Sequence, residues 1–218
     1  MQKVHPMQLI TKLYTMNLLT QNTKIKLTGT ELKKKVFNFS IPAFKTALGK
    51  ITCPFADSCV KFCYAQKGNY KRFPSVRNSM EKKYTLTKQD NFIQLMNKEI
   101  IKKKPDFIRV HDSGDYYSPK YLNKWLTIAT ENPAVKFYSY TNSIKFIKDL
   151  KNIPINFDFI FSDSGKQVNL IDKNKDRHTK IFSSSNELQK AGYTDASKID
   201  LYSTKWYNKT NKVGLIFH

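Results

Sequence analysis

The chain has 218 residues, 40% of them hydrophobic, which is enough for one domain with a buried core and too few for two large ones. Its 38 lysines and arginines outnumber 17 aspartates and glutamates and give a formal net charge of +21. This charge excludes a neutral surface and favours a polyanionic partner, a nucleic acid or a nucleotide. Biased codon usage is the alternative explanation, because only four of the cations are arginine.

No stretch of the sequence approaches the roughly 18 apolar residues that cross a membrane, and residues 1–21 lack the apolar run of a signal peptide. We therefore expect a cytoplasmic protein with no membrane partner. The cysteines, Cys53, Cys59 and Cys63, are odd in number and close together. They cannot form a closed set of disulfides, and the cytoplasm would keep them reduced and available to a metal.

The pattern of apolar residues predicts strands that alternate with helices. A helical arm over about residues 1–35 comes first. The expected strands cover residues 36–42, 106–111, 135–140 and 157–162, with weaker strands at 180–182 and 213–217. Helices are expected over 76–104 with a break near Thr87, from the Ser118-Pro119 cap, over 143–150, and from Ser185 or Asn186. This order predicts a single α/β domain over residues 1–218, built as a partial, open parallel β/α barrel of about six strands.

Polar residues gather where the predicted strands end. The cysteines follow the first strand, His111 to Asp115 the second, Thr141 and Asn142 the third, and Asp163 to Gly165 the fourth. In parallel α/β folds, ligands bind at the carboxyl ends of the strands. We therefore expect these four clusters to form one active site.

The three thiols of the cysteine loop can have one of three roles. Thiolates are soft ligands, and three of them hold three corners of a 4Fe–4S cluster and leave the fourth iron open. A structural zinc ion would need a fourth protein ligand, for which His111 is the first candidate and His178 the second. Buried thiols that act as small apolar groups are the third reading. The polar neighbours Asp57, Ser58 and Lys61 argue against a dry core and favour the cluster.

Three closely spaced cysteines after the first strand, followed directly by Tyr64, and the Ser113-Gly114-Asp115 sequence after the second strand resemble the radical S-adenosylmethionine enzymes. The resemblance implies a 4Fe–4S cluster on the three cysteines, with S-adenosylmethionine on the open iron. It also implies that Tyr64 approaches the adenine and that Ser113, Gly114 and Asp115 meet the methionine amino group. The spacing of five and then three intervening residues is wider than the three and then two that are usual there.

Other polar residues at the strand ends are candidates for the same pocket. His111 would serve the cofactor or the substrate, and hydroxyl or carboxylate groups would meet a ribose or substrate hydroxyls at Ser139, Thr141, Ser162 and Asp163. Arg109 lies within a strand, where its guanidinium meets either a ligand phosphate or carboxylate or a carboxylate of the protein. His178, beside Arg177 in a charged segment, is expected to be solvated.

A basic and aromatic segment follows the cysteine loop. Residues 66–73 read Gln-Lys-Gly-Asn-Tyr-Lys-Arg-Phe, and we expect nucleic-acid contacts from Lys67, Tyr70, Lys71 and Arg72. Trp125, by contrast, lies at helical spacing from Tyr121 and is expected in the core.

Four segments resemble the bacteriophage gene product 88 family and together cover nearly the whole chain. They are Cys53-Pro-Phe-Ala-Asp-Ser-Cys59 with Cys63-Tyr-Ala65, Arg109-Val-His-Asp-Ser-Gly-Asp115, Phe137-Tyr-Ser-Tyr-Thr141 and Val213-Gly-Leu-Ile-Phe-His218. The resemblance implies a phage or prophage protein that acts in the cytoplasm of a bacterial host.

Three functions remain open from the sequence. The first is a radical S-adenosylmethionine enzyme that acts on a nucleotide or nucleic acid and receives electrons from a donor. The second is a binding module for nucleic acid or a host protein, in which the metal only fastens the loop. The third is a zinc hydrolase with Asp115 or His111 as its base.

Overall fold

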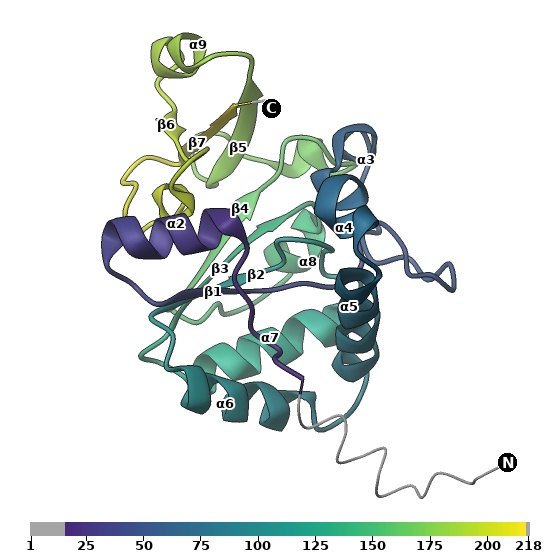
Figure 1. Ribbon diagram of the computed structural model, residues 1–218. Coiled ribbons are helices and arrows are strands. Elements are labelled where there is room, and N and C mark those ends of the chain that lie inside the picture. Colours follow the sequence, from purple (N-terminus) through teal and green to yellow (C-terminus); the bar gives the residue numbers. More distant parts are fainter. Residues whose placement is uncertain (1–15, 217–218) are drawn as a thin grey trace, which may run out of the picture.

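A computed structural model of the chain describes residues 16–216, except for the side chains of Phe62, Asn69 and Lys71 (Figure 1). The strands are β1 (Val36–Phe39), β2 (Phe107–Val110), β3 (Lys136–Thr141), β4 (Phe157–Phe161), β5 (His178–Phe182), β6 (Thr194–Asp195) and β7 (Lys212–Ile216). The α-helices are α2 (Thr23–Leu32), α3 (Cys59–Phe62), α4 (Gly68–Arg72), α5 (Pro74–Thr87), α6 (Phe92–Lys103), α7 (Pro119–Glu131), α8 (Ile144–Lys148) and α9 (Ser185–Lys190). Short 3-10 helices are η1 (Tyr64–Gln66), η2 (Val168–Leu170) and η3 (Asp200–Ser203).

All the strands of the described chain belong to one parallel sheet, in the order β1-β2-β3-β4-β5-β7-β6. The sheet is curled and open (Figure 1), so the predicted class, a partial parallel β/α barrel, is confirmed. The sheet has seven strands rather than about six, because β6 is two residues long and too short for an apolar pattern to reveal. The strands β4 and β5 pair through one residue pair, Phe161 and His178.

The sheet buries an apolar cluster on each face. On the outer face, α5 to α8 pack against the strands, and the rings of Phe39, Phe92 and Trp125 meet edge to face at centroid distances of 5.1 to 5.7 Å. Trp125 is fully buried, as predicted. On the inner face, α2 and η3 cover the strands, with Ile25 and Leu201 among the buried residues (Figure 1). Burial of large apolar side chains on both faces is the main stabilising term of such a sheet.

Capping residues set the ends of several helices. Ser118 accepts a hydrogen bond from Tyr121 N at 3.2 Å and Pro119 is the first residue of α7, as the sequence predicted. The predicted break near Thr87 falls between α5 and α6. Ser184, rather than Ser185 or Asn186, caps α9 by accepting from Glu187 N. Of the predicted N-terminal arm, residues 1–15 lie outside the described chain and α2 forms the remainder.

No helix of residues 16–216 combines the length and the apolar character needed to cross a membrane.

Candidate functional site

The carboxyl ends of β1 to β4 lie at one edge of the sheet, which we call the rim and which comprises residues 52–66, 111–115, 141–143 and 162–165. Backbone hydrogen bonds fasten the cysteine loop across it. Asp115 N donates to Thr52 O at 3.2 Å, Cys59 N to Ser164 O at 3.4 Å, and Lys166 N to Phe55 O at 2.9 Å. The loop therefore spans the ends of β2 and β4, and the structure brings together the clusters that the sequence placed at one site.

All three cysteines are free thiols of intermediate exposure. Phe44 N donates to Cys53 Sγ at 3.2 Å, and Asn142 Nδ2 approaches Cys59 Sγ at 3.8 Å. Burial is the main cause that raises the pKa of Cys53 and of Cys59, and the charges of Asp115 and Cys63 raise both further. The three sulfurs thus lie on one loop, where Asp115 and Cys63 act on both Cys53 and Cys59. Within the described residues, no three His, Cys, Asp or Glu side chains meet closely enough to hold a metal ion.

Asp115 joins the second strand end to the third. Its Oδ1 accepts from Thr141 Oγ1 at 2.6 Å and from Tyr116 N at 2.7 Å, and its Oδ2 accepts from Asn142 N at 2.9 Å. Burial raises the pKa of Asp115 to about 6, although these bonds oppose the shift. Because three donors of the protein occupy the carboxylate, Asp115 positions Thr141 and Asn142 at the rim.

Gly114 and Ser113 lie where the loop after β2 passes close to β1. Gly114 has φ +84°, and a Cβ there would overlap Ile41 Cγ1 and lie 3.2 Å from Ile41 O. Ile41 N donates to Ser113 O at 3.1 Å, which fixes this close approach. Only glycine fits such a position. The Ser113 hydroxyl is buried and has no hydrogen-bond partner among the described residues.

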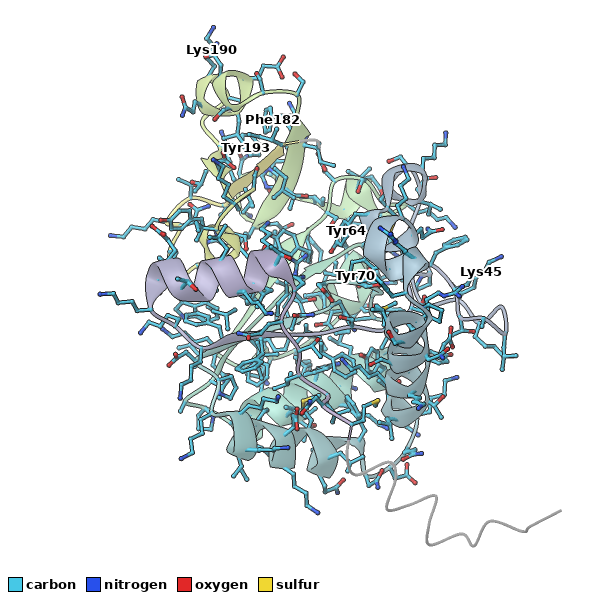
Figure 2. All side chains as sticks on the ribbon, viewed as in Figure 1. Lys45, Tyr64, Tyr70, Phe182, Lys190 and Tyr193 are labelled. Atoms are coloured by element: carbon cyan, nitrogen blue, oxygen red, sulfur yellow. The ribbon has the colours of Figure 1, made fainter. Side chains whose placement is uncertain are left out.

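Asp112 collects hydrogen bonds from three segments far apart in the sequence. Its carboxylate accepts from Asn22 Nδ2 at 2.8 Å, from Tyr70 OH at 2.7 Å and from the Ser40 hydroxyl. Tyr64 OH donates to the Asp112 carbonyl, and the rings of Tyr64 and Tyr70 meet edge to face at 5.8 Å (Figure 2). These contacts draw η1 and α4 over the rim. Asp112 lies within the expected cluster from His111 to Asp115, but the sequence assigned it no role of its own.

A buried ion-pair network lies on the inner face. Arg109 Nη1 donates to both carboxylate oxygens of Asp200, at 3.0 and 3.1 Å, while Lys24 Nζ at 2.9 Å and Tyr138 OH at 2.7 Å also reach Asp200. Burial alone would raise the pKa of Asp200, but the charges of Arg109 and Lys24 outweigh it and lower the pKa to about 2. The sequence left open whether Arg109 contacts a ligand or a carboxylate of the protein, and in the structure it contacts the carboxylate of Asp200. Asp200, distant in sequence, was not expected.

Two of the predicted pocket residues face other protein groups. His111 Nε2 lies 2.9 Å from Tyr121 OH, and its ring packs on Tyr116 at 4.7 Å. Burial is the main cause that lowers the pKa of His111 to about 3. Ser139 Oγ donates to Val110 O at 2.8 Å and is fully buried. Both side chains contact neighbouring strands and rings, while His111 Nδ1 has no hydrogen-bond partner among the described residues. Their place in a binding pocket stays a prediction.

The prediction that His178 is solvated is wrong. It is 1% exposed, with Nδ1 at 2.9 Å from Asp176 O and Nε2 at 3.1 Å from Tyr193 OH. Its position as the first residue of β5, paired with Phe161, explains this burial. Ser162 and Asp163 follow β4 at the rim, where Ser162 N donates to Thr141 O at 2.9 Å and burial raises the pKa of Asp163.

The predicted nucleic-acid contacts divide into two groups. Lys67 and Arg72 are exposed, and Arg72 lies 5.8 Å from the ring of Phe73. Tyr70 is partly buried and bonded to Asp112, which occupies its hydroxyl. The Lys71 side chain falls outside the described structure. Exposed cations beside the exposed rings of Phe73 and Tyr64 remain available to a polyanion.

Five buried polar atoms at the rim have no hydrogen-bond partner among the described residues. They are Thr52 Oγ1, Gln66 Nε2, His111 Nδ1, Ser113 Oγ and Asn142 Oδ1. An unpaired buried polar atom costs about 1–3 kcal/mol, so native proteins rarely keep several together without a ligand or solvent to satisfy them. The sequence motifs did not predict Gln66 as a site residue. The only indication in the sequence is that Gln66 directly follows Cys63-Tyr-Ala65.

Comparisons with known proteins place this chain among bacteriophage proteins. The family model "Gene product 88" matches residues 16–213. The "Gene 88 protein" of Mycobacterium phage L5 is 30% identical over 106 residues, which cover 41% of this chain and 42% of the phage protein. No solved structure matches. These matches give no support to the resemblance to radical S-adenosylmethionine enzymes, which stays a prediction. Because the family model covers most of the sequence, the chain belongs to the Gene product 88 family of bacteriophage proteins.

Proposed function

We propose that this protein is an iron–sulfur enzyme of the phage-infected host cytoplasm that resembles the radical S-adenosylmethionine enzymes. In this proposal Cys53, Cys59 and Cys63 hold a 4Fe–4S cluster, and the substrate is a nucleotide or nucleic acid. The supporting observation is that three free thiols lie on one loop, fastened by hydrogen bonds across the carboxyl edge of an all-parallel sheet. That edge is where parallel α/β folds bind ligands.

The chemistry of the donors fits the cluster. Three thiolates suit iron and leave one iron without a protein ligand. The loop is fastened at Cys53, which accepts from Phe44 N, and at Cys59, whose N donates to Ser164 O. Cys63 lies between α3 and η1 in an extended conformation. All three side chains are partly exposed, and in this proposal rotation about their χ1 angles turns them toward the metal.

The unpaired atoms at the rim fit an amino-acid ligand. Asn142 Oδ1 and Ser113 Oγ are acceptors for an ammonium group, and Gln66 Nε2 is a donor for a carboxylate. Gly114 lets the loop that carries Ser113 pack closely against Ile41, which fixes the position of Ser113 at the rim. Asp115, which the resemblance implied at the amino group, instead holds Asn142 through its backbone N. We therefore propose that Asp115 positions Asn142, and that Ser113, Gln66 and Asn142 contact the ligand.

The cluster and S-adenosylmethionine, when bound, would supply reductive cleavage with an external one-electron donor. The contribution of this chain is binding, orientation and exclusion of water. Tyr64 and Tyr70 draw η1 and α4 over Asp112 beside the cysteine loop. The half-exposed Tyr64 ring offers one face to a flat adenine or base.

Anaerobic reconstitution with iron and sulfide tests the proposal. We expect broad visible absorbance, with iron and sulfide bound in equal amounts, and an electron-paramagnetic spectrum of the reduced protein that changes on addition of S-adenosylmethionine. Each single Cys→Ser variant should lose most of the iron. Ser58→Ala is the matched control, because it removes only the bond from Ser58 Oγ to Ser164 O in the same loop and should keep the iron. A colourless product without sulfide would refute the proposal.

A binding module without catalysis is the second candidate. The observation that favours it is that the described residues hold no preformed set of three metal ligands. In this case a metal would only fasten the loop, and the charge of +21 would provide the attraction to nucleic acid or to an acidic host protein. Zinc bound at one per chain with no sulfide, or a cluster spectrum unchanged by S-adenosylmethionine, would favour the module.

A further inference from the structure

A small hairpin projects from the protein directly beside the cysteine loop. Residues 44–52, which we call the finger, leave the end of β1 and return to Cys53. Thr52 N donates to Phe44 O at 2.8 Å at its base, and Lys45 pairs with Ile51 in an antiparallel bridge. Figure 1 shows this loop standing out from the body beside α5, and Figure 2 labels Lys45 on it.

Hydrogen bonds fix the shape of the finger. Thr46 N donates to Lys50 O at 2.8 Å, and Lys50 N donates to Thr46 Oγ1 at 3.0 Å. Gly49 turns the chain with φ +76°, a conformation that favours glycine. Ala47 N donates to Glu81 Oε1 of α5 at 2.7 Å, which fastens the tip to a helix. The finger is therefore a pre-ordered element, which loses little conformational entropy when it binds.

The tip of this ordered element is apolar and exposed. Leu48 is 88% exposed and Ile51 is 48% exposed. An isolated exposed leucine needs no explanation, but here the backbone is built to hold it away from the core. Lys45 and Lys50 lie on either side of it, and both are exposed. The finger thus presents the apolar side chains of Leu48 and Ile51 beside two cations, with Leu48 the more exposed.

The surroundings of the finger carry a strong positive charge. From residue 44 to residue 82 the sequence holds two carboxylates, Asp57 and Glu81, of which Glu81 accepts the bond from Ala47 N. The same stretch holds eight cations, which are Lys45, Lys50, Lys61, Lys67, Lys71, Arg72, Arg77 and Lys82. This charge complements a polyanion. The exposed rings of Tyr64 and Phe73 lie in the same segment and offer faces for stacking.

We propose that the finger is a wedge that inserts Leu48 between stacked bases of a base-paired nucleic acid, while Lys45 and Lys50 contact the flanking phosphates. Proteins that open base steps use single apolar side chains such as leucine for this purpose, with cations beside them. Insertion into a lipid surface would need a broad apolar face, which Leu48 and Ile51 alone do not supply. The base of the finger is fixed to the rim by the bond from Asp115 N to Thr52 O, so an opened base would lie next to the cysteine loop.

This inference rests on the proposed function only for the chemistry at the rim, because binding and unstacking need no metal. The test therefore uses the full chain without iron, and again after reconstitution. Duplexes of DNA and of RNA carry 2-aminopurine, whose fluorescence rises on unstacking, at one of several positions. Anisotropy measures binding in the same samples. The DNA and RNA arms identify which kind of duplex is opened.

We expect salt-dependent binding and a fluorescence rise at saturating protein, with or without iron. Leu48→Ala should keep the affinity within about threefold and lose most of the rise, because the phosphate contacts dominate affinity. Lys45→Ala combined with Lys50→Ala should lower the slope of log K against log salt by about 2. Ile155→Ala is the matched control, since Ile155 is 91% exposed just before β4, at the opposite edge of the sheet. It should behave like the unaltered protein.

Three results would overturn the inference. They are no binding to either duplex, an undiminished rise with Leu48→Ala, and equal or tighter binding to anionic vesicles that depends on Leu48. Failure of iron reconstitution with a Leu48-dependent rise would refute the proposed function and leave the finger as a wedge. If the cluster is bound but no duplex is opened, the wedge is refuted and the proposed function stands.

Discussion

Arg109 and Asp200 form a buried ion pair between residues 91 positions apart, with Nη1 at 3.0 and 3.1 Å from the two carboxylate oxygens. Asp200 is fully buried and Arg109 is 9% exposed. Lys24 from α2 joins the pair, so Asp200 connects η3 both to β2 and to the helix that covers the inner face. The pair therefore holds together segments from the beginning, middle and end of the described chain.

Replacement Asp200→Asn should lower the free energy of unfolding by about 3–5 kcal/mol at pH 7, because it leaves the buried Arg109 without its partner. The pKa of Asp200 is about 2 in the folded protein and about 3.9 in an unfolded chain. Its stabilising contribution is therefore complete above pH 4 and is lost as the pH falls toward 2. Urea denaturation between pH 7 and pH 3 measures both effects.

Asp149→Asn is the control for this prediction. Asp149 and Lys145 form an exposed pair at 3.2 Å, with side chains 59% and 63% exposed. Such pairs contribute less than about 1 kcal/mol. Equal losses for Asp149→Asn and Asp200→Asn would contradict the assignment of a buried network.

Lys83→Met should stabilise the protein. Lys83 is 2% exposed, its Nζ lies 5.6 Å from the ring of Phe39, and burial lowers its pKa to about 8. Between pH 8 and about 10.4 the unfolded chain binds more protons at this lysine, so the unaltered protein gains stability as the pH rises. Methionine removes the cost of a buried cation, and we expect a gain of about 1–3 kcal/mol at pH 7.

Thermal and urea unfolding at pH 7 and pH 10 check this second prediction. The stability difference between Lys83→Met and the unaltered protein should shrink at the higher pH. Lys82→Met, one residue earlier on the exposed side of α5, should show neither the gain nor the pH dependence. A loss of stability in Lys83→Met at pH 7 would show that the ammonium group is needed there.

Gly114→Ala should destabilise the protein and disturb the rim, while Gly192→Ala should only destabilise it slightly. Both glycines have positive φ, +84° and +71°, but nothing lies within 4 Å of a Cβ at Gly192, whereas one at Gly114 would overlap Ile41. We expect a cost of about 1–2 kcal/mol for the backbone strain at both positions. At Gly114 overpacking should add about 1–3 kcal/mol. Urea denaturation of both variants separates the two effects, and equal costs would contradict the close approach.

The sequence predicted the elements whose apolar pattern is strong. The strands at Phe107 and Phe157 and the capped helix at Pro119 appear where they were expected, because burial of regularly spaced apolar side chains determines them locally. The two-residue strand β6 had no such pattern. His178 was misjudged since its burial depends on β7 and on Tyr193, which lie later in the chain.

The candidate site was predictable to the extent that strand ends share an edge. That principle places Cys53, Asp115 and Asn142 together without knowledge of the side chains. It does not reveal which groups pair inside the protein. Asp115 has three donors of its own, and Arg109 has Asp200, and neither partnership follows from local sequence. Unpaired atoms such as Gln66 Nε2 emerge only once every other partner is known.

The inner face of the sheet is covered in part by η3, which is synthesised after β1 to β4. The ribosome synthesises β1 to β4 and the helices between them before it reaches Asp200. During this interval Arg109 and Tyr138 lack the carboxylate that they contact in the folded protein. The inner face can close only after residues around 200 have been made, so collapse of the early strands alone does not complete this fold.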